Sequence, residues 1–149
     1  MIMNSNKRIH SYRDLVVWQR AIALVVGTYE LTRSFPSAER FGLTSQMRRA
    51  GVSVPANIAE GNGRVHRGEY VHHVSIARGS LHELETMLIL SVELGFSSAG
   101  SVAPLLTTAS EVSRMLGALL RALQRASRER TQKRAQRRPS GDSSLVPSP

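Results

Sequence analysis

Apolar residues recur at intervals of three and four along four separate stretches, and this spacing limits the fold more than any other feature of the chain. Such spacing places residues on one face of an α-helix, whereas a half-buried strand would alternate. The stretches span about residues 14–33, 38–61, 67–94 and 101–125, and short segments join them. Short connections make consecutive helices antiparallel neighbours. The sequence therefore predicts an all-α protein, an antiparallel up-down four-helix bundle.

Most apolar positions fall on one core-facing stripe per helix, and the ends carry capping signals. Asp14, Ser37 and Ser101 are expected N-caps, and Gly95 is expected just after a C-cap. The expected core stripe of the first helix is Leu15, Trp18, Ile22, Val25, Tyr29 and Thr32. That of the third is Tyr70, Val74, Ala77, Leu81, Leu84, Leu88 and Leu94, and that of the fourth is Val102, Leu105, Leu106, Ala109, Val112, Leu116, Leu119 and Leu123.

A second set of apolar residues falls off these stripes. On the first helix the set is Val16, Val17, Ala23 and Val26, and on the third it is Ile76, Ile89 and Val92. Apolar side chains on a second face need burial against another surface. A neighbouring copy of the chain is the simplest source of that surface, so we expect a homo-oligomer.

Pro55 stands inside the second stretch, where a proline usually breaks a helix. Its apolar stripe, however, keeps its phase across the proline, and so does a polar stripe beside it. The apolar stripe is Met47, Gly51, Val54, Ile58 and Gly61, and the polar stripe is Arg49, Ser53, Asn57, Glu60 and Arg64. We therefore expect one helix kinked at Pro55, whose small residues let another helix approach and form a seam through which the protein self-associates. The rival interpretation is a ligand-binding turn between two helices.

Positive charge is concentrated near the C-terminus. The chain has a formal net charge of +9, and residues 121–138 contain eight basic residues against one acid. A segment of this kind should bind polyanions non-specifically, although basic ends also serve only to keep proteins soluble. We expect a flexible N-terminus at residues 1–11, the bundle at 12–126 and a disordered basic tail, rich in proline and serine, at 127–149.

Composition argues against several classes of function. The chain has no cysteine, no apolar run near the ~18 residues of a membrane span and no signal-like start, so we expect a cytoplasmic protein that does not contact a membrane. Glu69 and His72 have the spacing of di-iron carboxylate bundles, but a second such pair is missing. Ser80 and His82 lack an orienting acid, and no glycine-rich phosphate loop is present. We expect no enzyme activity, no cofactor and no metal.

Three sequence blocks, read in order, resemble a known family. The blocks are YRDLVVWQRA, RSFPSAERFGLTSQMRRAGVSVPANIAEGNGR and YVHHVSIARGSLHELETML, within residues 12–123. They are similar to the bacterial four-helix-bundle proteins encoded by intervening sequences of 23S ribosomal RNA genes, and to the accessory proteins of diversity-generating retroelements. The resemblance implies a ring, commonly a homopentamer, a surface able to hold RNA or DNA, a reverse transcriptase partner in the retroelement branch, and no catalysis.

The sequence departs from the family pattern at two histidines. His73 stands where the family usually has an aromatic residue such as phenylalanine, and His72 where a basic residue is usual. A buried histidine needs a hydrogen-bond partner that phenylalanine does not. The basic segment beyond Arg125 lies outside the resemblance and inherits nothing from it.

Arginines are the candidate nucleic-acid contacts, because the planar guanidinium can make paired hydrogen bonds to phosphate. The candidates are Arg20, Arg48, Arg49, Arg64, Arg67, Arg121 and Arg125. A structural polar network is the favoured role for Asn57, Glu60 and Arg78, although Arg78 could also meet phosphate and Arg49 or Arg64 could join the network. No aromatic residue is expected beside the basic ones, which argues against base stacking. The main hypothesis is a nucleic-acid-associated assembly protein, and the rival is an adaptor for a protein partner.

Overall fold

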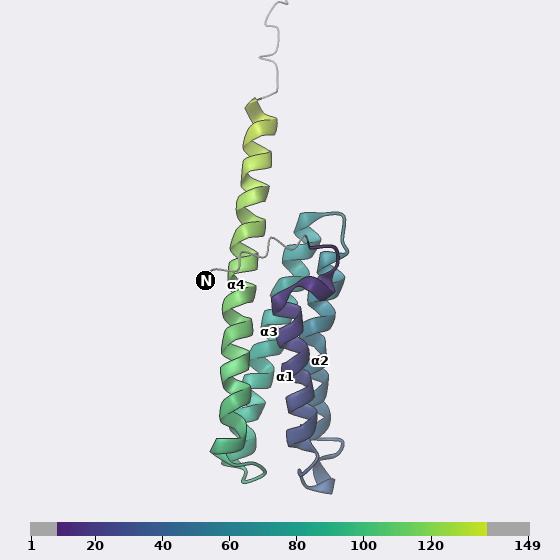
Figure 1. Ribbon diagram of the computed structural model, residues 1–149, viewed down its shortest axis with the longest axis vertical. Helices are drawn as coiled ribbons and strands as arrows, with labels where there is room; N and C mark the ends of the chain where they lie inside the picture. The colour runs from purple at the N-terminus through teal and green to yellow at the C-terminus, as the bar shows by residue number, and fades with distance from the viewer. Residues whose placement is uncertain (1–8, 137–149) are drawn as a thin grey trace, which may run out of the picture.

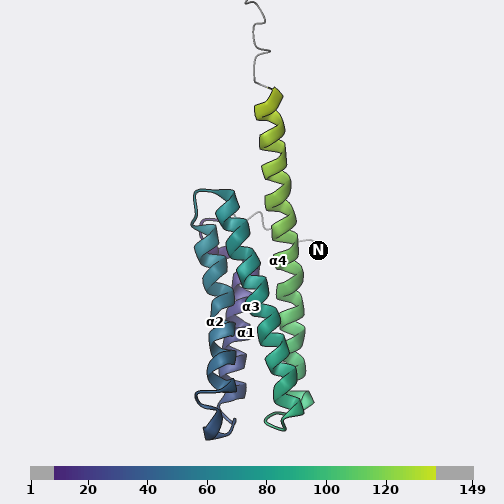
Figure 2. The same cartoon turned by 180° about the vertical axis from the view of Figure 1, so that it is seen from behind.

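The computed structural model describes residues 9–136, and over this range it is entirely helical apart from short connections. The helices are α1 (Val16–Thr32), α2 (Leu43–Asn62), α3 (Arg67–Glu93) and α4 (Ala99–Gln136), with the short 3-10 helices η1 (Tyr12–Asp14) and η2 (Ser37–Glu39). Each helix packs against the next in sequence, and α4 returns to α1 (Figure 1, and from behind in Figure 2). The predicted all-α four-helix bundle is confirmed.

The first helix begins later than expected because Asp14 caps a different element. Its carboxylate accepts from the backbone amides of His10 at 2.9 Å and Ser11 at 3.1 Å, which closes a capping box around η1. The α1 helix then starts at Val16, with Leu15 at its N-cap and no side-chain cap. The prediction that Asp14 caps the first long helix was therefore wrong.

The core-facing stripe of α1 is rotated from the expected one. The buried residues of α1 are Val17, Ala21, Leu24, Thr28 and Thr32. Ile22 and Tyr29, expected in the core, are exposed, and Val17, expected outside, is in the core. The two threonines are accommodated because their hydroxyls donate 2.8 Å hydrogen bonds to the carbonyls of Leu24 and Thr28.

The second helix is continuous through Pro55, as predicted. Its apolar stripe is buried as a whole (Met47, Gly51, Val54, Ile58 and Gly61). This stripe is used inside the protomer, where α2 packs most extensively against α3. A Cβ atom added at Gly61 would lie 2.7 Å from Cδ2 of Tyr70 and 2.9 Å from Cβ of His73, so the missing side chain lets α2 and α3 approach closely.

The start of α2 also differs from the prediction. Ser37 opens η2 and does not cap the long helix, which begins at Leu43. Oε2 of Glu39 instead accepts a 2.9 Å hydrogen bond from the backbone amide of Leu43. A carboxylate at this position satisfies a free N–H and opposes the positive end of the helix dipole.

The third helix ends at the predicted glycine. Gly95 has a φ of +74°, and the amides of Phe96 and Gly95 bond back to Ser91 and Val92, each at 2.9 Å. This is a Schellman turn, which glycine permits because it has no Cβ. It places Phe96 against Phe35 of the α1–α2 connection, with ring centroids 5.8 Å apart.

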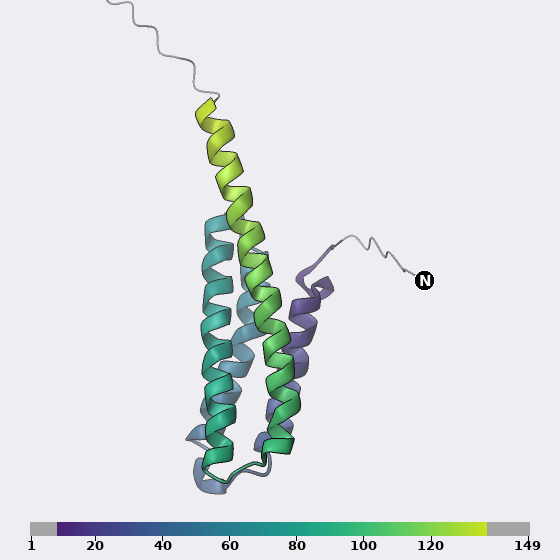
Figure 3. The same ribbon diagram turned by 90° about the vertical axis from the view of Figure 1, so that its left-hand side faces the viewer.

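The fourth helix is longer at both ends than expected. It starts at Ala99, and Oγ of Ser98, not of Ser101, accepts from a free helix amide at 3.1 Å. It continues to Gln136, well past the expected end near Arg125, so residues 127–136 are helical. Figure 3 shows its C-terminal part extending beyond the other three helices. Residues 137–149 of the expected tail, and residues 1–8 of the N-terminus expected to be flexible over 1–11, lie outside the described residues.

The structure largely agrees with the predicted core of α3 and with the predicted second apolar faces of α1 and α3. The core includes Val74, Ala77, Leu81, Leu84 and Leu88, whereas Leu94 was wrongly assigned to it and is exposed. Of the spare set, Val16, Val26, Ile76 and Ile89 are exposed, and Val92 instead packs against the core.

Candidate nucleic-acid interface

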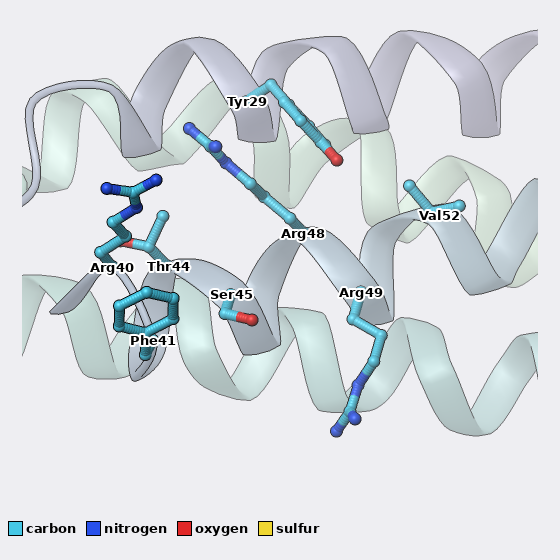
Figure 4. A pocket seen from close by; sticks show the side chains of 8 residues that line it. All are labelled: Tyr29, Arg40, Phe41, Thr44, Ser45, Arg48, Arg49 and Val52. Carbon is cyan, nitrogen blue, oxygen red and sulfur yellow. The ribbon is translucent and has the colours of Figure 1, made fainter.

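Three arginines and two aromatic rings line an open hollow between α1 and the start of α2. Its volume is about 510 Å³, and its lining residues are Tyr29, Arg40, Phe41, Thr44, Ser45, Arg48, Arg49 and Val52. None of these residues, all within the described range, is acidic. Figure 4 shows that they come from α1, from the turn before α2 and from the first turns of α2. The hollow is therefore positively charged.

Arg48 crosses from α2 to α1 and is held there by two contacts. Its guanidinium carbon lies 4.5 Å from the centre of the Tyr29 ring, and its Nε donates a 3.0 Å hydrogen bond to Oγ1 of Thr32. Figure 4 shows the side chain reaching toward Tyr29, whereas the guanidinium of Arg49 points to the other side of α2. The hydrogen bond to Thr32 uses Nε, so the two outer nitrogens of Arg48 remain available to a ligand.

Arg40 and Phe41 form a second arginine–aromatic pair at the turn before α2. The Arg40 guanidinium carbon lies 5.4 Å from the centre of the Phe41 ring. The Phe41 side chain is 87% exposed, the most exposed aromatic ring among the described residues. An exposed ring of this kind offers a face on which a planar group can stack.

The hollow corrects the expectation that no aromatic residue lies beside the basic ones. Tyr29 was expected in the core, and Arg40 and Phe41 were not singled out at all. The adjacent Arg-Phe pair before the second helix was the available signal. Guanidinium groups can bind phosphate, and an exposed ring can stack on a base, so the arrangement suits a single-stranded nucleic acid.

A chain of polar side chains joins α2 to α3 on another part of the surface. Oγ of Ser53 lies 2.8 Å from Oγ of Ser80, and Nδ2 of Asn57 donates to the carbonyl oxygen of Ser53 at 2.9 Å. Oδ1 of Asn57 faces Nδ1 of His73 at 3.0 Å, and Nε2 of that ring lies 3.8 Å from Oε1 of Glu60. Asn57 thus supplies the partner that a histidine at position 73 requires.

The remaining predicted residues of the bundle are spread over separate places. Arg64 forms ion pairs with Glu60 and, at 3.9 Å, with Glu69. Arg20 pairs with Glu111 of α4 at 3.3 Å. The structure thus brings Asn57 and Glu60 together through His73, but Arg78 is not part of their network. Within residues 9–136, one nitrogen each of Arg78 and Arg67 is buried without a hydrogen-bond partner.

Arg121 and Arg125 lie far from the hollow, on the exposed C-terminal part of α4. Together with Gln124 and Arg128 they line a separate shallow depression. The seven predicted nucleic-acid contacts therefore do not form one continuous patch. Only Arg48 and Arg49 share the hollow, and the nucleic-acid role of every one of them stays a prediction.

The acidic and histidine side chains of the described residues give no geometry for a metal site. Between residues 9 and 136, no group of three or more His, Cys, Asp or Glu side chains is placed to hold a metal ion. Glu69 is instead one of the partners of Arg64. Within this range, no helix is both long and apolar enough to cross a membrane.

Comparison with known proteins finds one matching family and a solved structure with the same fold. A family model described as 23S rRNA-intervening sequence protein matches residues 13–118. A crystal structure of a protein of unknown function from the S23 ribosomal protein family of Bacteroides thetaiotaomicron VPI-5482 has the same fold, with a TM-score of 0.64 and 20% sequence identity. The likeness covers 70% of this chain and 98% of that one. No curated protein matches the sequence.

Proposed function

Because the chain belongs to the 23S rRNA-intervening sequence protein family, we propose that it is a non-catalytic, self-associating protein that binds nucleic acid through the arginine–aromatic hollow. The observation on which the proposal rests is the composition of that hollow. It combines three arginines with two accessible rings, and no carboxylate lines it. The family is named after a ribosomal RNA, which makes single-stranded RNA the first ligand to test.

In the proposed complex the two kinds of side chain have different tasks. Arg40 and Arg48 neutralise and hydrogen-bond backbone phosphates, and Arg49 adds positive charge at the edge of the hollow. Neither role needs a particular base. Phe41 stacks on an unpaired base, which any of the four bases permits. The binding is therefore sequence-tolerant, salt-dependent and selective for unpaired segments.

Self-association is supported by the apolar side chains that α1 and α3 leave exposed. Val16 and Val26 of α1 are 58% and 53% exposed, and Ile89 of α3 is 53% exposed. A second copy would remove these side chains from water, and the resemblance to ring-forming proteins favours a homopentamer. In such a ring, several hollows would act on one RNA molecule, which raises the overall affinity without any new contact.

Titration of a labelled single-stranded RNA into the full chain, followed by fluorescence anisotropy at low salt, tests the proposal. Arg40→Gln and Phe41→Ala should each weaken binding. The matched controls, Arg114→Gln and Val65→Ala, remove an exposed arginine and an exposed apolar side chain elsewhere, and should leave binding unchanged. Equal affinities for the hollow variants and their controls would contradict the proposal.

An adaptor for a protein partner, such as a reverse transcriptase, is the second candidate function. The same exposed apolar residues favour it, since a partner protein could cover them as well as another copy could. In that case a Val26→Asp variant would lose the partner in a pull-down with the purified reverse transcriptase. The Phe41→Ala variant would not change RNA affinity, and this distinguishes the two candidates.

A further inference from the structure

The C-terminal part of α4, residues 121–136, forms an arm that leaves the bundle after Leu123, which still packs against the core, and that has no counterpart in the family match. The α4 helix has 38 residues and α3 has 27, and because they run side by side, α4 extends past the bundle (Figures 1 and 3). From residue 127 onward every side chain of this arm is exposed. The family match ends at residue 118, so the arm is a feature of this chain in its own right.

Basic residues lie on opposite faces of the α4 arm. The arm contains six basic side chains and one acidic one, Glu129. Arg121 and Arg125 are each nine residues before Arg130 and Arg134, respectively, which is about two and a half helical turns. The two pairs therefore point in opposite directions. Among the described residues, no basic side chain of the arm takes part in an ion pair.

The composition of the arm favours one kind of polyanionic partner over the others. A membrane-surface helix needs an apolar face, but the only apolar residue after Ala126 in the described arm is Ala135. Base stacking on single strands needs aromatic rings, and the arm has none. A flat acidic protein surface would engage one face of the arm and leave the other in water. Charge on opposite faces matches a groove with an anionic wall on each side.

We propose that the α4 arm inserts into the major groove of double-stranded DNA and contacts the phosphates on both walls. That groove admits an α-helix, whereas the major groove of duplex RNA is too deep and narrow. Sixteen residues span about 24 Å of helix, which is comparable to about seven base pairs. The arm is thus a second, duplex-binding element, and this inference uses none of the residues of the hollow.

Binding should also stabilise the helix of the arm, because the free protein carries like charges one turn apart on it. Arg121 and Arg125, and likewise Arg130 and Arg134, have the i, i+4 spacing at which like charges destabilise a helix. Phosphates between and around these residues neutralise that repulsion. The helical circular-dichroism signal of the full chain should therefore persist to higher temperature when duplex DNA is present.

Anisotropy titrations of a labelled 20-base-pair DNA into the full chain, repeated at several salt concentrations, test the proposal. One variant replaces Arg121, Arg125 and Arg128 with Gln, and another replaces Arg130, Lys133 and Arg134 with Gln. Each should lose about ten-fold or more in affinity at low salt and lower the logarithmic salt slope by about 2–3, because each removes three phosphate contacts. A control with all five arginines of the arm changed to Lys keeps the charge and should keep the slope.

Several results would overturn the groove proposal. One is an unchanged affinity in either face variant, since a helix in a groove uses both faces. A second is that duplex RNA of the same sequence binds as tightly as the DNA. A third is that mixed phosphatidylserine–phosphatidylcholine vesicles bind as tightly as the DNA. Phe41→Ala should leave duplex DNA binding intact, and the Phe41-dependent part of RNA binding should survive in both face variants. Failure of the arm and failure of the hollow are thus distinguishable.

Discussion

Asn57 on α2 and His73 on α3 share a hydrogen bond of 3.0 Å across the helix pair that packs most extensively in the bundle. Nδ2 of Asn57 donates to the carbonyl oxygen of Ser53, so the oxygen of the amide faces the ring. An amide oxygen only accepts, and Nδ1 of His73 must therefore carry the proton. The contact fixes the tautomer of the histidine and leaves its Nε2 toward Glu60 at 3.8 Å.

Replacing Asn57 with Ala should destabilise the protein, because the largely buried His73 ring loses its acceptor. The expected loss is about 1–3 kcal/mol in the free energy of unfolding, measured by urea denaturation. The His73→Phe variant needs no acceptor, so in that background the same Asn57→Ala change should cost clearly less. Equal costs in the two backgrounds would show that the hydrogen bond contributes nothing.

Replacing Gly61 with Ala should force α2 away from α3. The new Cβ would meet Tyr70 at 2.7 Å and the backbone-proximal Cβ of His73 at 2.9 Å, and overpacking of this kind costs about 1–3 kcal/mol. Gly68→Ala is the matched control, because among the described residues a Cβ added there meets nothing within 4 Å beyond its chain neighbours and its own helix backbone. Since Ala is the better helix former, Gly68→Ala should stabilise the protein by up to about 1 kcal/mol in the same denaturation experiment.

The neighbouring arginines of the hollow should differ in their effect on stability. Arg48 stacks on Tyr29 and donates to Thr32, so Arg48→Gln should cost about 1–2 kcal/mol by thermal or urea unfolding. Arg49 is exposed and has no partner among the described residues, so Arg49→Gln should stay within about 0.5 kcal/mol of the parent. A similar cost for both would mean that the Arg48 contacts do not persist in solution.

A charge on the outer face of α1 should block self-association without unfolding the protomer. Val26→Asp places a carboxylate in the exposed apolar face, which a second copy could cover only at the cost of burying a charge. Light scattering after gel filtration should show a smaller species than for the parent chain. A Val65→Asp control changes an apolar residue that is 91% exposed in the α2–α3 turn and should leave the mass unchanged. A parent chain that is already monomeric would refute the oligomer.

Much of the bundle could be predicted from the sequence, and the exceptions have physical reasons. Helix α2 was predictable across Pro55 because two stripes of different chemistry kept the same phase. In α1, valine and isoleucine occur on several sides, so spacing alone could not choose the buried face. Ala21 and Thr28 form that face because small side chains, with hydroxyls bonded to the preceding turn, allow close packing.

The hollow and the α4 arm were harder to predict, for opposite reasons. Tyr29 and Arg40 belong to different elements, and only the α1–α2 connection brings them to one hollow. Residues 127–136 of the arm were expected to be disordered because they are polar, but they are helical. Arginine, glutamine, alanine and lysine are nevertheless good helix formers, and no glycine or proline interrupts the chain between Gly117 and Pro139.

The contact between Phe35 and Phe96 has a consequence for how the chain could be divided. These rings connect the α1–α2 loop to the α3–α4 loop, so the α1–α2 hairpin and the α3–α4 hairpin are in contact at one end of the bundle. At the other end the hairpins are joined by the short α2–α3 turn, which contains the exposed Val65. A backbone cut there would separate two self-contained halves that retain their mutual apolar surfaces. Co-expressed as fragments, the halves should reassemble, and the turn is therefore the natural place to split this protein into a complementation reporter.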